Sequence, residues 1–207
     1  MKTRAEIKLQ AKSIMKAKYG AVIVPYVLYM LIAAVASSIT LGIGSILILP
    51  LAVGLCFVYL MLYRGENPSF EMMFTSALQE NFVRKLGGML LVGIYTFLWS
   101  LLFVIPGIIK GYSYALTPYI LAQFPNLTAT EAIDLSRRIM DGRKMELFIV
   151  DLSFIGWYLL GMITFGISLI FHTEPYMMLT KAGCFDEYIR DALANGRITE
   201  ADLKINA

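Results

Sequence analysis

Five side chains that can carry a charge interrupt the apolar runs of this sequence, and they are its first candidates for chemistry. They are Lys110, Asp151, His172, Glu174 and Lys181. An ionisable group inside a membrane is costly, so each one is a functional hypothesis by default. A carboxylate that faces an ammonium group there can gate a path, bind a ligand or hold two helices in register.

The depth of these residues in their apolar runs predicts two ion pairs. Lys110 and Glu174, with His172 beside the glutamate, form a predicted outer pair. Asp151 and Lys181 form a predicted inner pair. Under a functional hypothesis the pairs are two gates, or a substrate path, between three helices. Under the alternative they only lock the helices in register, or both lysines extend to the membrane interfaces.

Residue types that most enzymes need are scarce in this chain. His172 is the single histidine, which excludes a multi-histidine metal site. Cys56 and Cys184 lie far apart, in or beside apolar segments, and this placement predicts buried thiols. The sequence has no glycine-rich phosphate loop and no serine nucleophile with a basic partner. We therefore expect a protein that is not an enzyme, with no cofactor and no metal.

The composition indicates an integral membrane protein. Of the 207 residues, 58% are hydrophobic and 16% are charged, whereas soluble domains carry about 25% charged residues. Residues 147–170 are nearly continuous apolar sequence, long enough to cross a bilayer core of roughly 30 Å. The basic N-terminus has features of a signal peptide, but its apolar run has counterparts later in the chain, so we expect it to be retained.

Six apolar runs predict six transmembrane helices in a single membrane domain, residues 1–207. The runs are residues 21–41, 46–63, 86–105, 108–124, 147–165 and 167–185. Helical spacing of apolar residues predicts three amphipathic surface helices, at residues 1–19, 69–85 and 128–144. In the last of these, Thr128 and Glu131 have the spacing of a capping box. Residues 186–194 predict a short tail helix.

The same order of elements occurs three times along the chain. Each unit has a surface helix, a crossing, a tight uncharged turn near a glycine, and a return crossing interrupted by a proline. The turn glycines are Gly42, Gly107 (after Pro106) and Gly166, and the prolines are Pro50, Pro118 and Pro175. The units cover about residues 1–66, 67–125 and 126–187, and residues 188–207 form a tail. We expect an all-α membrane fold of three hairpin repeats, related by an axis along the membrane normal.

The distribution of positive charge predicts the orientation of these helices. Apart from Lys110 and Lys181, the Lys and Arg residues lie in the surface segments, at Arg64 or in the tail. The positive-inside rule then places both termini and all surface helices in the cytoplasm. A sixth segment that does not span the membrane would instead put the tail outside.

The first surface helix carries candidates for lipid contact. Residues 1–19 contain six basic residues and one acid, and Lys8, Lys12 and Lys16 line one face. Such a helix lies well among anionic headgroups, where each cation contributes about 1 kcal/mol. The alternative is a solvated helix that only fixes topology. Anionic lipids are thus predicted partners, beside another membrane protein or a second copy of the chain. Nucleic-acid binding has no support.

The fourth predicted crossing carries small residues on one side. Gly107, Gly111 and Ala115 form this stripe, close to Lys110. Stripes of small residues let helices approach closely in membranes. The stripe therefore predicts a helix–helix contact.

Several segments of the second half of the chain follow a recognisable pattern. They are residues 136–148, 164–167, 174–176, 105–110 and 114–119, together with the most specific one, LSFIGW at residues 152–157. They resemble an uncharacterised family of small integral membrane proteins with six helices, found mainly in Gram-positive bacteria. The family has no established activity, so the resemblance implies a bacterial cytoplasmic membrane protein and no catalytic residues.

Two functions remain open at this stage. The first is a non-enzymatic membrane protein of the bacterial plasma membrane that binds lipid or other membrane proteins. The second is a small solute or ion transporter or channel that uses the charges between the fourth, fifth and sixth crossings. A water-accessible cavity that reaches those charges would favour the second hypothesis, and tightly packed pairs without a cavity would favour the first.

Overall fold

The computed structural model describes residues 2–39, 44–79 and 81–204, and within these ranges the chain is helical with no strand. The α-helices are α1 (Arg4–Ala17), α2 (Tyr19–Ile39), α3 (Gly44–Leu47), α4 (Leu49–Tyr63), α5 (Glu71–Phe74), α6 (Phe82–Leu102), α7 (Val104–Tyr114), α8 (Thr117–Gln123), α9 (Ala129–Ile139), α10 (Lys144–Leu152), α11 (Ile155–Ile163) and α12 (Glu174–Ala194). Two π-helical turns, η1 (Thr75–Gln79) and η2 (Leu169–Thr173), and one 3-10 turn, η3 (Ala201–Leu203), complete the described elements. The turn predicted near Gly42 lies outside the described residues.

Three helical segments of the described chain are long and apolar enough to cross a membrane. They are α2, α6 and the combined segment Lys144–Ile163, which contains α10 and α11. At most 22% of the apolar window of each is buried inside the protein, as expected for helices that face lipid. The all-α class is therefore confirmed, and the length and apolarity of these three segments support the membrane character predicted from the composition.

Each of the three return segments contains a helix that begins at its proline. Pro50, Pro118 and Pro175 lie in the first turn of α4, α8 and α12, respectively. Proline is accepted there because the first backbone N–H groups of a helix have no intrahelical acceptor. The prolines thus end one stretch of helix and begin the next, which is how they interrupt the return segments.

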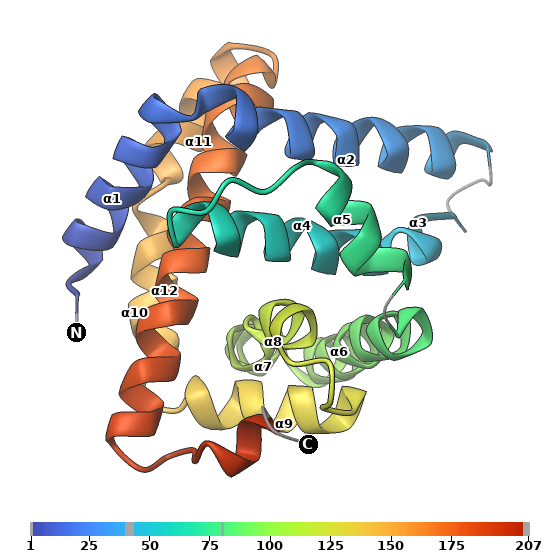
Figure 1. Ribbon diagram of the computed structural model, residues 1–207, viewed down its shortest axis with the longest axis vertical. Helices are drawn as coiled ribbons and strands as arrows, with labels where there is room; N and C mark the ends of the chain where they lie inside the picture. Colours follow the sequence, from blue (N-terminus) through green and yellow to red (C-terminus); the bar gives the residue numbers. More distant parts are fainter. Residues whose placement is uncertain (1, 40–43, 80, 205–207) are drawn as a thin grey trace.

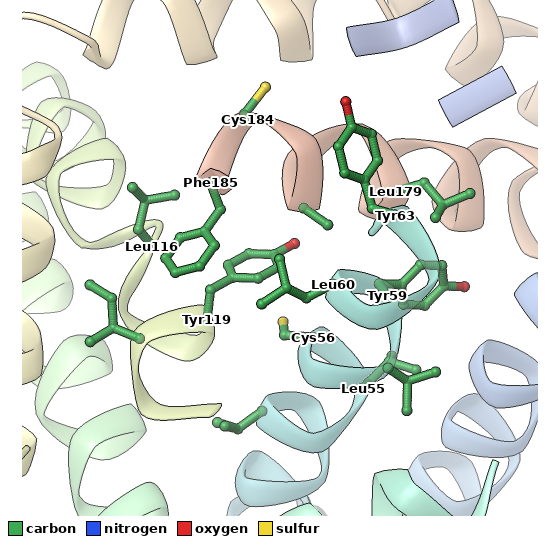
Figure 2. Packing of buried hydrophobic residues seen from close by; sticks show 14 of the residues in the cluster. Leu55, Cys56, Tyr59, Leu60, Tyr63, Leu116, Tyr119, Leu179, Cys184 and Phe185 are labelled. Carbon is green, nitrogen blue, oxygen red and sulfur yellow. The ribbon is translucent and has the colours of Figure 1, made fainter. Parts of the chain in front are cut away.

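The helices that begin at these prolines meet in the main apolar core. The Tyr119 ring of α8 stacks on the Phe185 ring of α12, with centroids 5.3 Å apart and planes 22° apart. Leu60 and Cys56 of α4 lie beside this stack (Figure 2). Cys56 and Cys184 are both buried and unoxidised, so the predicted buried thiols are confirmed.

One arginine links the same three helices through polar contacts. Arg64, directly after α4, forms an ion pair with Asp186 of α12 at 2.6 Å. It also donates a hydrogen bond to the Gln123 side chain of α8 at 2.9 Å. The guanidinium group suits this position because it has five donors in a planar fork. The three helices are therefore joined by the polar contacts of Arg64 and by apolar packing within the core.

The short surface helices cover this core from outside. α1 packs against α12, α5 and η1 pack against α4, and α9 packs against α8 and α6. The predicted capping box at the start of α9 is confirmed, because Thr128 and Glu131 each bond the other's backbone N–H. Thr3 and Glu6 form the same motif at the start of α1. Both helices thus begin with paired backbone donors that would otherwise lack partners.

The turn predicted at Pro106 and Gly107 is wrong in position. The chain reverses at Phe103, which is extended with φ −157°, and α7 starts at Val104. Pro106 and Gly107 therefore lie inside the first turns of α7. Proline so close to a helix start marks the helix itself and not the preceding turn. The third turn is where the sequence predicts it, since Gly166 adopts φ +86°.

Other predicted boundaries also differ from the structure. The surface helix expected at 69–85 is only α5 and η1, because α6 already starts at Phe82. The expected fourth and fifth crossings are each divided, into α7 and α8 and into α10 and α11. The separate tail helix at 186–194 is wrong, because α12 continues to Ala194 without a break. No glycine or proline lies between Gly183 and Ala194, so nothing in this segment ends the helix.

The helices do not stand parallel to one another. In Figure 1, α2 and α4 run side by side, α12 runs across them, and α6, α7 and α8 are seen nearly end-on. Ile108 and Ile109, near the start of α7, share a pocket with Lys144 and Met145 at the start of α10. The topology prediction places these two helix starts on opposite membrane faces. The starts of α7 and α10 therefore lie closer together than the sequence prediction allows.

The C-terminal segment docks beside α9 (Figure 1). Asp202 forms an ion pair with Arg138 at 2.8 Å, and Lys204 forms one with Glu131 at 2.8 Å. Next to these contacts, Ile198 and Leu203 are buried. The tail is thus held by an apolar anchor with a charged rim.

Replacing Gly54 should weaken the contact between α4 and the α5–η1 segment. A Cβ atom at Gly54 would lie 2.1 Å from the carbonyl oxygen of Met73. We expect Gly54→Ala to lower the free energy of unfolding by about 1–3 kcal/mol through overpacking, measured as a lower melting temperature in detergent. Gly20→Ala is the matched control, because a Cβ there meets no atom within 4 Å. Equal melting temperatures for the two variants would contradict this packing.

Acid should release the C-terminal segment from α9. The Lys204 and Thr128 hydrogen bonds lower the pKa of Glu131 from 4.5 to about 2, and the Arg138 hydrogen bond lowers that of Asp202. Because both pKa values are lower in the docked state, the carboxylates stabilise docking fully above their ordinary pKa values. This contribution is lost as pH falls toward about 2.

A spin label at the exposed Glu200 (Glu200→Cys) measures this release. Its spectrum should change from immobile to mobile as pH falls from about 5 to about 2. Asp202→Asn should be more mobile at neutral pH and less sensitive to acid. A label whose mobility does not depend on pH in either protein would show that the apolar anchor alone holds the tail.

Candidate functional site

The predicted inner ion pair is confirmed. Asp151, in the last turn of α10, lies with its Oδ1 atom 3.0 Å from Nζ of Lys181 in α12. Tyr112 of α7 donates a hydrogen bond from its hydroxyl to Oδ2 of Asp151 at 3.1 Å. The pair therefore joins three helices that come from two different hairpins.

Local structure explains how Asp151 reaches this position. α10 ends at Leu152, and Ser153 caps that end by donating its hydroxyl to the carbonyl oxygen of Val150. A new helix, α11, starts at Ile155. Asp151 is thus held just before a break, on a turn fixed by a side-chain hydrogen bond. Lys181 lies in the middle of α12 between the buried residues Thr180 and Ala182, so its backbone is fixed by the core.

A groove of about 380 Å³ leads to this pair. Four helices form its walls: α6 contributes Thr96 and Ser100; α7 contributes Gly107, Ile108, Gly111 and Tyr112, followed by its C-cap Ala115; α10 contributes Leu147 and Asp151; and α12 contributes Lys181. The side chains of Asp151 and Lys181 keep 26% and 29% of their exposure. The ion pair is therefore reached from the groove and is not sealed inside the core.

The predicted stripe of small residues lines the groove. A Cβ atom at Gly107 would lie 2.2 Å from the Ser100 hydroxyl oxygen, so this glycine is needed for the close approach of α6 and α7. A Cβ atom at Gly111 would meet only the Thr96 methyl group, at 3.8 Å. One end of the stripe thus packs helices, as predicted, and the middle leaves open space. The sequence pattern did not predict this open space beside Gly111.

A smaller apolar pocket of about 190 Å³ adjoins the groove. It shares Ile108 and Tyr112 with the groove and is otherwise lined by Ile109, Met145, Phe148 and Lys144. The Tyr112 ring meets the Phe148 ring edge-on, with centroids 5.9 Å apart. Tyr112 therefore forms the border between a polar compartment and an apolar one.

The predicted outer pair is not formed. The Lys110 ammonium lies 4.6 Å from the centre of the Trp99 ring, within its own hairpin. Glu174 accepts a hydrogen bond from the Tyr158 hydroxyl at 2.8 Å. Each charge is satisfied by an aromatic side chain, as a cation–π contact or as a hydrogen bond. The prediction failed because depth matching assumed parallel helices and considered only charged partners.

His172 belongs to a separate aromatic cluster. It lies in the π-helical turn η2, and its ring centroid is 4.5 Å from that of Trp157 and 6.0 Å from that of Tyr176. Phe154 packs edge-on against Tyr176 from the other side. The distinctive LSFIGW segment therefore supplies aromatic packing that joins α11 to α12, and His172 does not line the groove.

The three lysines of the surface helix have different environments. Lys8 donates a hydrogen bond to Oγ of Ser153 at 2.8 Å and lies 4.4 Å from the centre of the Phe154 ring. Burial lowers the pKa of Lys8. Lys12 and Lys16 are exposed. The first lysine thus holds α1 against the break between α10 and α11, and the other two can reach a charged surface.

The arrangement is suited to binding. Among residues 2–39, 44–79 and 81–204, no group of three or more His, Cys, Asp or Glu side chains could hold a metal ion. The groove instead offers one carboxylate, one ammonium group, hydroxyl groups and apolar walls. Thr96, Ser100 and Tyr112 were not among the predicted site residues. Only their polarity within apolar runs pointed to them.

Breaking the inner pair should destabilise the protein more than removing it. Asp151→Asn or Lys181→Met leaves one charge without its partner, whereas the double variant leaves none. Because the pair is partly exposed, we expect each single change to lower the free energy of unfolding by about 1–2 kcal/mol, and the double change to recover part of this loss. Melting temperatures in detergent test this expectation, and strictly additive losses would show that the two charges do not interact.

Comparison with known proteins shows a likeness to a family of unknown function over part of the chain. No curated protein and no solved structure matches the chain. The matched family region, residues 100–192, runs from the end of α6 into α12 and includes Lys110, Asp151, His172, Glu174 and Lys181. Over residues 100–192 the chain matches the family described as a protein of unknown function, DUF975, which confirms the predicted resemblance to an uncharacterised family.

Proposed function

We propose that this chain is a non-enzymatic membrane protein that binds a lipid in the groove between α6, α7, α10 and α12. The groove itself carries this proposal: it combines an ion pair with apolar walls, and it adjoins an apolar pocket. Ligand sites are typically concave and mostly apolar, with a few convergent polar groups that fix orientation. A lipid has the matching division into a polar head and an apolar tail.

The surroundings of the groove support a ligand that arrives from the membrane. Ile108, Ile109 and Met145, at its apolar border, are 51%, 48% and 66% exposed. In a membrane protein, such exposed apolar side chains contact acyl chains. The groove is therefore open to a molecule that moves within the bilayer.

The membrane arrangement is part of the same proposal. We place the chain in the bacterial plasma membrane with both termini in the cytoplasm. Two features support hairpin repeats: each return helix begins at a proline, and each surface helix packs on the return helix of the unit before it, with α1 closing the ring on α12.

Transport is the second candidate, and one observation favours it. The groove reaches a charge pair beside two broken helical segments, and discontinuous helices line many transport sites. A path through the membrane also needs polar groups at other depths. Among the described residues that line the groove, the charged ones are Asp151 and Lys181, while Lys110 and Glu174 lie elsewhere. Lipid binding therefore accounts for more of the geometry.

Filling the groove tests the proposal directly. Gly111→Leu adds a side chain where only the Thr96 methyl group is near, so the helix packing should survive while the space is lost. We expect native mass spectrometry of protein purified from phospholipid vesicles to show at least about tenfold less retained lipid, a loss of about 1.4 kcal/mol in binding.

Gly93→Leu is the matched control, because it lies on α6 and a Cβ there meets no atom within 4 Å. This variant should retain as much lipid as the unmodified protein. If Gly111→Leu also retains normal lipid and melts normally, the lipid does not occupy the groove.

A further inference from the structure

We propose that the groove selects a phospholipid whose headgroup carries a primary ammonium group beside its phosphate, the chemistry of phosphatidylethanolamine. This inference rests on the proposed lipid binding and names the class of ligand. It follows from the charges that line the groove and from the groups that surround them.

The groove carries one negative and one positive side chain. Asp151 and Lys181 lie side by side at 3.0 Å and are both partly exposed to the groove. A ligand with one net charge would pair with one of them and leave the other opposed by a like charge. A headgroup with an ammonium and a phosphate can pair with both at once. The two protein charges and the two ligand charges then alternate.

The Asp151 and Lys181 side chains can form more hydrogen bonds than they make within the protein. Oδ1 of Asp151 is buried against Nζ of Lys181, whereas Oδ2 accepts a hydrogen bond from the Tyr112 hydroxyl. A carboxylate has about four lone-pair sites, and a lysine ammonium has three donors. Oδ2 therefore keeps an acceptor site for a ligand ammonium group, and Lys181 keeps donors for a phosphate.

The residues that line the groove suit a primary ammonium group better than a quaternary one. Sites for quaternary ammonium groups surround the cation with aromatic faces. In the described lining of this groove, Tyr112 is the aromatic residue and the other wall residues are small, aliphatic, hydroxyl-bearing or charged. A primary ammonium group has N–H donors that a carboxylate can accept in strong charge-assisted bonds. The lining thus favours ethanolamine over choline.

The apolar pocket provides a place for the lipid tail. It begins at Tyr112, next to the ion pair, and continues between Ile109 and Phe148. A headgroup at Asp151 therefore has an apolar path leading away from it along α7 and α10. This continuity supports a whole lipid as the occupant over a free headgroup.

Competition between lipids in one bilayer tests the inference. The protein would be assembled in nanodiscs that contain equal amounts of phosphatidylethanolamine and phosphatidylglycerol, and in a second set with phosphatidylcholine in place of phosphatidylglycerol. Native mass spectrometry would then identify the lipid that stays bound. We expect phosphatidylethanolamine to be enriched about tenfold in both sets, since its headgroup alone can form charge-assisted hydrogen bonds with both Asp151 and Lys181.

Two variants link this selectivity to the ion pair. The double variant Asp151→Asn with Lys181→Met keeps a neutral groove and should fold, but its enrichment should fall to about twofold or less. Lys110→Met removes a charge that lies against Trp99, outside the groove, and should retain the preference. Phosphoethanolamine in solution, added as a competitor, should displace little lipid because it lacks the tail.

The outcomes distinguish this inference from the proposed function. Equal retention of phosphatidylethanolamine and phosphatidylcholine, or a preference for phosphatidylglycerol, would overturn the headgroup assignment while Gly111→Leu still abolished lipid retention. Full displacement by phosphoethanolamine would overturn the lipid as the occupant. Loss of the preference in the double variant alone, with total lipid retained, would support the assignment.

Discussion

The Asp151–Lys181 ion pair is the constraint around which the second half of the structure is arranged. Charges in apolar surroundings must be paired, so the pair fixes α10 against α12. Tyr112 adds α7 through its hydrogen bond to Asp151. The helix break after Asp151 is fixed by Ser153, whose hydroxyl donates a hydrogen bond to the Val150 carbonyl oxygen and accepts one from Lys8 of α1. One polar contact thus orients three helices of two hairpins and, through its neighbour, the N-terminal surface helix.

The apolar core explains why space remains beside that pair. The helices that begin at Pro50, Pro118 and Pro175 bury their side chains against one another, whereas the long helices α2 and α6 bury few of theirs. The pair lies at the edge of this core, where α6 and α7 approach closely at Gly107 and leave room at Gly111. A rigid core and a loosely filled edge are a common setting for a ligand site.

Local features of the sequence predicted local features of the structure. The capping box at Thr128, the turn at Gly166 and the buried thiols follow from residue chemistry within a few positions, and each is confirmed. The inner pair could also be predicted, because two charges at matching depth on consecutive segments meet wherever the segments pack together. The helical class and the family resemblance needed only composition and short motifs.

Features that depend on how helices cross could not be predicted in the same way. The pairing of Lys110 with Glu174 assumed parallel helices, but the second hairpin crosses the third, and each charge meets an aromatic residue instead. The groove has no sequence signature, since the same glycine stripe can close a contact or leave it open. Its polar lining comes from separate helices that only the tertiary structure brings together.

The most direct test of this account is an experimental structure of the protein in a bilayer that contains phosphatidylethanolamine. The account predicts lipid density between α7 and α10, with its headgroup against Asp151 and Lys181 and its tail passing Tyr112. A groove closed by side chains, or an empty groove with ordered lipid bound elsewhere on the protein, would contradict it.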